Sequence, residues 1–301
     1  MLEYRAEGLC RNANHLSREE LSRCMASGEV LQSTALAYDT GHRLRFELGG
    51  LRGIMPFADC VDAAPGETVK DIAVLTRVGR PTCFVIMGTE FDENGEEYYL
   101  LSRAEAQRRC RAQYLDTLEA GSVIPCTVTH IENFGAFCDI GCGALGLLGT
   151  RRICMSRPAH AADCLRVGQR IFTAVRTLDP VQRRVTLTMR ELLGTWQENA
   201  ARFRAGQTVT GIVRTVTDYG AFIALTPNLC GLAETDGRLR PGQAVCVFIR
   251  AILPETLRIK LTVLHPLEAL PPQALVYTRT EGHLDLWRYG TPDRAKAVTI
   301  F

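Results

Sequence analysis

The sequence lacks several features that would define its class. It has no uninterrupted apolar run of 18 residues, and its start, residues 1–5, has no apolar stretch, so we expect neither a transmembrane helix nor a secretory signal. Its 12 cysteines include no C-x-x-C pair, a spacing that does not favour zinc. We therefore expect a cytoplasmic protein with reduced, mostly buried thiols, no membrane association and no metal.

Catalytic motifs are also missing. There is no G-x-x-x-x-G-K-[ST], no H-E-x-x-H and no G-x-S-x-G, and the six histidines are scattered along the chain. Residues 141–146 match G-x-G-x-x-G, but a dinucleotide site needs a helix to begin there, and residues 147–158 have no helical pattern. We expect a protein that is not an enzyme and has no cofactor.

Lysine is rare, because 32 of the 35 basic residues are arginine. Arginine suits bidentate phosphate binding and stacking on bases, although a GC-rich genome explains the bias at least as well. Residues 1–120 carry 14 basic and 19 acidic side chains, whereas residues 121–204 carry 11 and 6. An acidic first third and a basic middle indicate different partners for different domains.

The sequence does contain an internal repeat. Residues 121–147 align without gaps to residues 206–232 at an offset of 85, and both copies contain the triplet G-A-F after an aromatic residue. Each copy consists of short Val-, Thr- and Ile-rich runs bounded by Gly, Asn, Asp and Pro, a pattern typical of strands. A weaker third copy begins at residues 28–56. Five short strands in about 70 residues fit a small closed barrel.

The last strand of each strong copy alternates apolar and polar residues, which predicts one buried and one solvated face. In the second module the two faces are Val185, Leu187 and Met189 against Arg184, Thr186 and Thr188. In the third module they are Ile259, Leu261 and Val263 against Arg258, Lys260 and Thr262. In the first module, Asn94-Gly95 between two β-prone runs predicts a hairpin.

Three connectors open with the sequence S/T-x-x-E, which is typical of a helix N-terminus. They begin at Ser17, Ser102 and Thr188, and each run ends at a glycine, namely Gly28, Gly121 and Gly206. The fold class is therefore mainly β, with three tandem five-stranded barrels joined by short helices, plus a C-terminal tail. The expected segments are an N-terminal helical segment (1–27), a degenerate barrel (28–102), a linker helix (103–120), a second barrel (121–189), a linker helix (190–205), a third barrel (206–265) and the tail (266–301).

The pattern G-x₆-V…[FY]-G-A-F…G-L…G-Q…D-x₄-R-[VI]-x-L-[ST] resembles the S1 RNA-binding domain, a branch of the OB-fold. It is matched at residues 121–188 and less completely at 206–262. The whole chain resembles the short three-domain ribosomal protein S1 homologues of Clostridia-type bacteria. The resemblance implies OB-fold barrels that bind single-stranded RNA.

In S1 domains the two aromatics of [FY]-G-A-F and a basic residue near the last strand line one face of the barrel. The resemblance carries these roles to Phe134, Phe137 and Arg184 in the second barrel, and to Tyr219, Phe222 and Arg258 in the third. Each base that stacks on such a ring contributes about 1–3 kcal/mol, whatever the base. The alternative is that one ring of each pair belongs to the core. The basic stretch of the second barrel adds Arg151, Arg152 and Arg170 as expected phosphate contacts, against the alternative of a solvated loop.

The sequence departs from the family in three places. The usual histidine after G-L is replaced by Gly149 and Glu234, and the third barrel lacks eleven residues that the second barrel has before its last glycine. In the first barrel the aromatic positions become His42 and Arg45, so no stacking pair survives there. That barrel is either a protein-docking module or a degenerate barrel without a partner.

These observations predict a non-enzymatic protein that binds single-stranded RNA or mRNA and associates with the small ribosomal subunit in translation, docking through residues 1–102. It is expected to be a monomer off the ribosome. The alternatives are an RNA-binding accessory factor in RNA decay or in ribosome dormancy. The sequence gives no preferred RNA sequence, no partner of the first barrel and no role for the tail, whose Trp287 and Tyr289 are expected to pack on the third barrel.

Overall fold

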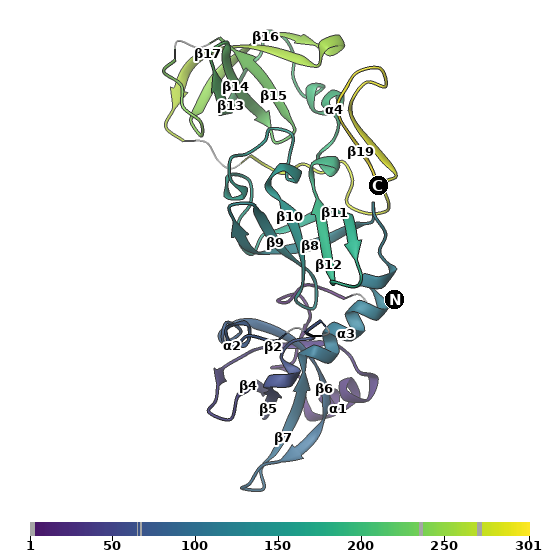
Figure 1. The fold of residues 1–301 in the computed structure, drawn as a ribbon. Helices are drawn as coiled ribbons and strands as arrows, with labels where there is room; N and C mark the ends of the chain where they lie inside the picture. Colours follow the sequence, from purple (N-terminus) through teal and green to yellow (C-terminus); the bar gives the residue numbers. More distant parts are fainter. Residues whose placement is uncertain (1–3, 65, 67, 235–236, 270–272) are drawn as a thin grey trace. The chain divides into compact units, whose positions relative to one another are not determined.

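The computed structural model describes residues 4–64, 66, 68–234, 237–269 and 273–301 (Figure 1). The chain forms two compact units with separate hydrophobic cores. The first unit comprises Met1–Leu118, Asp139–Leu145 and Asp179–Arg184, and the second comprises Glu119–Cys138, Gly146–Leu178 and Val185–Phe301. Within the described residues, no helix is both long enough and apolar enough to cross a membrane.

The first helix, α1 (Arg18–Ser27), begins and ends as the sequence predicts. The Ser17 hydroxyl accepts the N–H of Glu20, and the Glu20 carboxylate accepts the N–H of Ser17 at 2.9 Å, so the capping box is complete. Gly28 ends the helix with φ 66°, a left-handed conformation that favours glycine. Leu21 and Cys24 are buried and attach the helix to the first core.

The first module contains a seven-stranded sheet in the order β1-β2-β6-β7-β5-β4-β3. The strands are β1 (Arg11–Asn12), β2 (Leu31–Thr34), β3 (Ala37–Tyr38), β4 (Arg43–Leu48), β5 (Leu51–Pro56), β6 (Pro81–Phe91) and β7 (Glu97–Ser102). Short helices η1 (Phe57–Asp59) and α2 (Asp71–Leu75) lie between β5 and β6.

This sheet differs from the expected five-stranded barrel because its first strand is interrupted. Strand β2 pairs with β6, and β3 pairs with β4. Between them, the N–H of Ala35 donates to the carbonyl of Arg80, and the N–H of Leu36 donates to the carbonyl of Arg45. The segment from β2 to β3 thus pairs on both sides, as the first strand of a barrel does. The remaining difference is β1, a short parallel strand added beside β2.

The hairpin between β6 and β7 is confirmed. The N–H of Gly95 donates to the carbonyl of Asp92, and Gly95 has φ 75°. Helix α3 (Arg103–Gln113) begins at the predicted Ser102, whose hydroxyl accepts the N–H of Glu105 at 3.0 Å. The predicted extension to Gly121 is wrong, because Tyr114 leaves the helical conformation and only the single turn η2 (Leu115–Thr117) follows.

The second module is a closed barrel in the order β10-β12-β11-β8-β9. Its elements are β8 (Val123–Glu132), β9 (Gly135–Gly141), β10 (Ala144–Gly149), η3 (Thr150–Arg152), η4 (Ala161–Asp163), β11 (Arg170–Asp179) and β12 (Arg184–Thr188). Residues 141–143 form the turn between β9 and β10, all with positive φ. The G-x-G-x-x-G match therefore lies in a β-hairpin and not at the start of an α-helix, which excludes the dinucleotide fingerprint.

The third module is also a closed barrel, in the order β13-β14-β15-β17-β16. Its elements are β13 (Thr208–Thr217), β14 (Gly220–Thr226), β15 (Leu229–Ala233), β16 (Ala244–Leu253), η6 (Pro254–Thr256) and β17 (Arg258–Leu267). The alternation predicted for β17 is confirmed, since Ile259 and Leu261 are buried while Lys260 is exposed. In β12 the prediction is wrong for Thr188, which is buried and donates a hydrogen bond to Glu191.

The connector between the two closed barrels also corrects the sequence prediction. Instead of one helix opened at Thr188, the chain forms the turn η5 (Arg190–Leu193), then Gly194 with φ 84°, and then α4 (Trp196–Ala200). The capping box that forms is that of Thr195 and Glu198. Gly194 breaks the helix because a left-handed residue cannot continue a right-handed turn.

The tail packs on both closed barrels of the second unit. Strands β18 (Leu286–Gly290) and β19 (Ala295–Ile300) form a hairpin whose Trp287 and Tyr289 join the core of the third module, which confirms their expected packing. On the second barrel, Tyr277 packs edge-to-face on Phe172 at 5.4 Å between ring centroids. The tail is therefore a structural part of the second unit.

Candidate nucleic-acid interface

The aromatic pair of the second barrel lies at the turn between β8 and β9. Phe134 precedes β9 and is 58% exposed, while Phe137 is half-buried within the strand. The ring centroids are 6.0 Å apart at an interplanar angle of 90°, an edge-to-face contact. Neither ring belongs to the barrel core, so the alternative of one core phenylalanine does not hold here.

The third barrel repeats this arrangement. Tyr219 is 67% exposed and Phe222 is half-buried, with centroids 6.1 Å apart at 89°. Two barrels of one chain thus present ring pairs of the same geometry at the same place in the fold. Exposed aromatic pairs of this kind offer flat apolar faces on which bases can stack.

Glycine makes this turn possible in both barrels. A Cβ on Gly135 would lie 2.4 Å from the Leu148 carbonyl oxygen, and one on Gly220 would lie 2.5 Å from the Ala233 carbonyl oxygen. The chain must pass this close to the neighbouring strand directly after the first ring. The glycine of [FY]-G-A-F therefore fixes the position of both rings.

Strand register places one further cation on the ring face of the third barrel. Phe222 pairs with Leu232, and Leu232 pairs with Lys260, so the three side chains lie on the same face of the sheet. Arg258 lies two residues before Lys260 on β17 and shares that face. Sequence reasoning placed Lys260 on the solvated face but missed it as a site residue.

The predicted arginines of the second barrel lie in different surroundings. Arg184 is the exposed first residue of β12, as Arg258 is of β17. Arg151 is exposed in η3 and follows Thr150, whose N–H donates to the Phe134 carbonyl at 2.9 Å. Arg170 is exposed at the start of β11, two residues before Phe172. Among the described residues, none of these guanidinium groups lies over the ring of Phe134 or Phe137.

Arg152 lies beside a buried polar cluster. Burial, followed by the charge of Arg190, lowers the pKa of its guanidinium. Its carbonyl accepts the N–H of Met189 at 2.9 Å, and Glu191 lies buried between Arg190 and Thr299. This setting favours a structural role for Arg152 over an RNA contact.

The aligned face of the first module is chemically different. Arg45, in the place of the second ring, is held by Asp39 at 2.8 Å. His42, in the place of the first ring, contacts the ring of Tyr38 edge-to-face at 5.9 Å and shares a 3.0 Å hydrogen bond with its hydroxyl. The aligned positions thus hold a guanidinium that shares one carboxylate with Arg43, and an imidazole bonded to a tyrosine.

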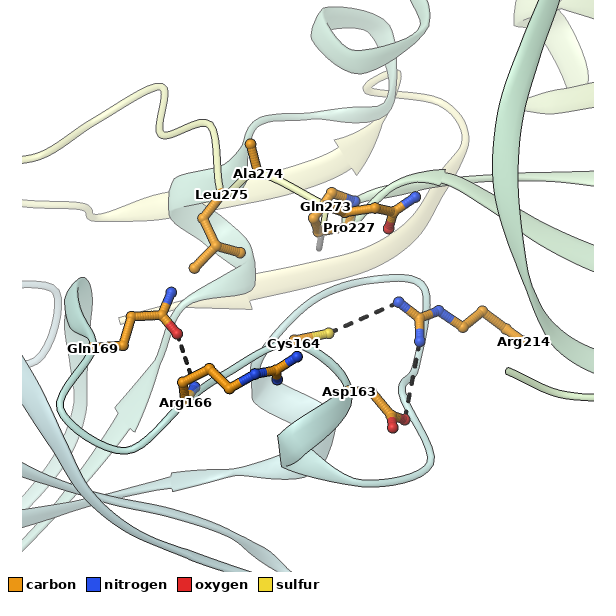
Figure 2. A pocket seen from close by; sticks show the side chains of 9 residues that line it. All are labelled: Asp163, Cys164, Arg166, Gln169, Arg214, Pro227, Gln273, Ala274 and Leu275. Carbon is orange, nitrogen blue, oxygen red and sulfur yellow. Dashed lines mark hydrogen bonds and ion pairs between the residues drawn. The ribbon is translucent and has the colours of Figure 1, made fainter. Parts of the chain in front are cut away.

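A pocket of about 280 Å³ lies in the second unit, and no sequence motif indicated it (Figure 2). One side comes from the segment between β10 and β11, where the second barrel is longer than the third. The other side comes from β13, the turn after β14 and the part of the tail before its hairpin. The lining residues are Asp163, Cys164, Arg166, Gln169, Arg214, Pro227, Gln273, Ala274 and Leu275.

A pair of thiols adjoins this pocket. Cys164 Sγ, which lines the pocket, is 4.0 Å from Sγ of the buried Cys154. The contact with Cys164 lowers the pKa of Cys154 to about 7, with further help from Ser156 and the charge of Arg214. Arg214 adds a positive charge near both sulfur atoms, since its Nη2 lies 3.9 Å from Cys164 Sγ and its charge helps to lower the pKa of Cys154.

Comparison with known proteins gives no matching family model, but several curated relatives. The small ribosomal subunit protein bS1 of Neisseria meningitidis is 36% identical over 228 residues, covering 74% of this chain and 38% of the relative. The bS1 protein of Rhizobium meliloti is 30% identical over 191 residues, covering 59% and 33%. The bS1 protein of Streptococcus pneumoniae is 28% identical over 252 residues, covering 76% and 59%.

The chain spans between a third and three fifths of the length of these three relatives. Among solved structures, it is similar to a multidomain protein with nucleic acid binding domains from Streptococcus pneumoniae, at 13% identity, 79% and 74% coverage, and a TM-score of 0.27. It is also similar to GSP13 from Bacillus subtilis, at 20% identity, 30% and 74% coverage, and a TM-score of 0.25. The closed barrels, the [FY]-G-A-F turns and the curated relatives agree, and the chain belongs to the S1-domain family of OB-fold proteins.

Proposed function

We propose that this protein binds single-stranded RNA through the ring pairs of its second and third barrels, as a non-catalytic factor that works with the small ribosomal subunit in translation. The observation that carries the proposal is the repetition of one exposed edge-to-face pair in both barrels. Exposed aromatic surface of this size is unfavourable in water unless a partner covers it. The curated relatives, small ribosomal subunit proteins by name, supply the cellular setting.

Both ring pairs belong to the same unit, which favours one RNA strand engaging both barrels. The Asn228 amide, fully buried on the turn between β14 and β15, accepts the N–H of Met155 at 2.9 Å and donates to the carbonyls of Arg190 and Gly194. These bonds connect the second barrel, the connector and the third barrel. A second stack on the same strand is then an intramolecular event, which raises the overall affinity.

Barrel two is the main RNA site under this proposal, because its region of the sequence is the most basic. Arg151, Arg170 and Arg184 are exposed and therefore accessible to an RNA phosphate backbone. Barrel three is auxiliary, since Glu234 replaces the histidine of the family and its segment before β16 is shorter. Lys260 and Arg258 supply its positive charge.

The first module has a different role in this proposal, which is docking on the small ribosomal subunit. Its aligned positions carry no exposed ring pair, and Arg45 is paired with Asp39. Residues 1–120 are net acidic, which disfavours phosphate binding. Off the ribosome, the protein is proposed to be a cytoplasmic monomer.

Fluorescence anisotropy with a labelled single-stranded RNA of about 12 nucleotides tests the binding proposal. If roughly four phosphates are neutralised, the logarithm of the association constant falls with the logarithm of salt concentration at a slope near −3. A duplex RNA of equal length should bind far more weakly, since its bases are not free to stack. A salt-independent affinity, or equal binding of duplex and single strand, contradicts the proposal.

Co-sedimentation of the tagged chain from cell extracts tests the cellular setting. The proposal expects the protein with small ribosomal subunits, in actively translating cells as well as in resting ones. Recovery with an RNA-degrading complex instead, or with idle ribosomes alone, would favour a role in RNA decay or in dormancy.

A further inference from the structure

The pocket of the second unit contains a buried arginine with few partners. The Arg214 side chain is only 7% exposed. Among the described residues, its Nε has no hydrogen-bond partner. Its Nη1 lies 3.9 Å from Asp163 Oδ2 and its Nη2 lies 3.9 Å from Cys164 Sγ, both too long for strong bonds. A buried guanidinium normally has close, charge-assisted partners, so this one is poorly compensated.

A second guanidinium faces the same space. In Figure 2 the side chains of Arg166 and Arg214 point toward one another, with Cys164 between them. Arg166 donates to the carbonyls of Ala162 and Leu165 at 2.5 and 2.9 Å, which hold it in place without neutralising its charge. Two cations thus converge on a pocket that contains one carboxylate.

That carboxylate is already engaged. Asp163 Oδ2 accepts the N–H of His160 at 3.1 Å, as part of the cap of η4. The two arginine side chains therefore carry one more positive charge than the single carboxylate of the lining can balance. Planar guanidinium groups of this kind match phosphate oxygens in geometry as well as in charge.

The rest of the lining fits a group larger than phosphate alone. Pro227, Ala274 and Leu275 form an apolar wall, and Gln169 and Gln273 provide amide groups. In the part of the chain that the structure describes, Gln273 Oε1 is buried without a hydrogen-bond partner, while its Nε2 donates to the Ala224 carbonyl at 2.9 Å. The volume of about 280 Å³ lies just below the range of roughly 300–1,000 Å³ typical of small-molecule pockets.

We propose that this pocket binds one nucleoside monophosphate unit, with its phosphate between Arg166 and Arg214 and its sugar or base against the apolar wall. The unit is either a free nucleotide or one nucleotide of an RNA strand, and only the second source rests on the proposed RNA-binding function. The unpartnered Gln273 oxygen accepts a hydrogen bond from a sugar hydroxyl or a base amino group. The ring pairs are separate from this pocket.

Isothermal titration calorimetry with the four nucleoside 5′-monophosphates, inorganic phosphate and a tetranucleotide RNA tests the proposal on the full chain. Arg214→Gln and the more exposed Arg166→Gln are each expected to weaken nucleotide binding at least about tenfold, the effect of losing a charge-assisted bond. Arg250→Gln, at an exposed arginine of β16 outside the lining, is the matched control and should change affinity less than twofold. Circular dichroism checks that each variant is folded.

A second readout follows the pocket itself. Ligand in the pocket should slow alkylation of Cys164, measured by site-resolved mass spectrometry, while Cys246, a partly exposed thiol of β16, reacts unchanged. Protection by RNA but not by free nucleotides assigns the site to the RNA strand. Protection by nucleotides in variants that lack Phe134 and Tyr219 shows that the pocket acts independently of the ring pairs. No protection by either ligand, or binding of inorganic phosphate equal to that of nucleotides, would overturn the proposal.

Discussion

Removing the two most exposed rings, Phe134 and Tyr219, tests the stacking interface most directly. They are 58% and 67% exposed, so their replacement by alanine leaves the cores intact. Each variant loses one edge-to-face contact, which costs about 0.5–1.5 kcal/mol of folding free energy at most. A lost base stack costs about 1–3 kcal/mol of binding free energy, which corresponds to a fall in RNA affinity of about 5- to 150-fold.

The assay is fluorescence anisotropy with two single-stranded RNAs. The shorter RNA can bind only one ring pair at a time, and the longer RNA can bind both ring pairs at once. If one strand engages both barrels, the longer RNA binds more tightly, and Phe134→Ala or Tyr219→Ala alone removes that gain. Ile300→Ala is the control, because Ile300 is an exposed apolar side chain, 69% exposed, on the tail hairpin. Unchanged RNA affinity in both ring variants, with circular dichroism showing that each variant is folded, would refute the stacking interface.

Two further substitutions test the surroundings of the rings and the connection between the barrels. Gly149→His restores the residue usual in the family, at a backbone of φ −64° and ψ 145° that any residue adopts. We expect RNA affinity to rise about two- to fivefold, and to rise more below pH ~6.5, where the imidazole is charged. Equal gains in affinity at pH 6 and pH 8 would argue against a charge effect. Asn228→Ala leaves the carbonyls of Arg190 and Gly194 without their donor and should lower the free energy of unfolding by at least about 2 kcal/mol. The measurement is thermal melting, with Asn133→Ala at an exposed asparagine as the control. Equal melting temperatures for the two variants would contradict the structural role of the Asn228 amide.

Local chemistry made much of the fold predictable. The capping box of Ser17 and Glu20 and the Asn94-Gly95 turn are decided by neighbouring residues, and both formed as predicted. The internal repeat was enough to align the two ring pairs, because in both barrels a Cβ on the glycine between the rings would lie only 2.4–2.5 Å from a carbonyl oxygen of the next strand. Both modules need a glycine at this position, so the same residue stands in both copies and the repeat makes it visible in the sequence.

Predictions failed where two local signals competed or where contacts join distant residues. Two capping sequences lie seven residues apart in the connector, and Gly194 decides in favour of the one at Thr195. The buried ion pair of Glu7 with Arg103, at 2.6 Å, joins residues 96 apart, and no local pattern indicates it. Asn228 has the pattern of a turn residue, yet its amide connects three segments of the second unit.

The longer segment of the second barrel is the main structural difference between two otherwise similar barrels. The same segment that docks through Met155 on the turn of the third barrel also carries Cys164 and Arg166 into the pocket. Its second contact with this turn is the N–H of Ser156, which donates to the Pro227 carbonyl at 3.0 Å, and Pro227 itself lines the pocket. A shorter segment, as in the third barrel, would remove the docking contacts and the pocket together. The added residues therefore provide both the docking of the second barrel on the third and one side of the pocket.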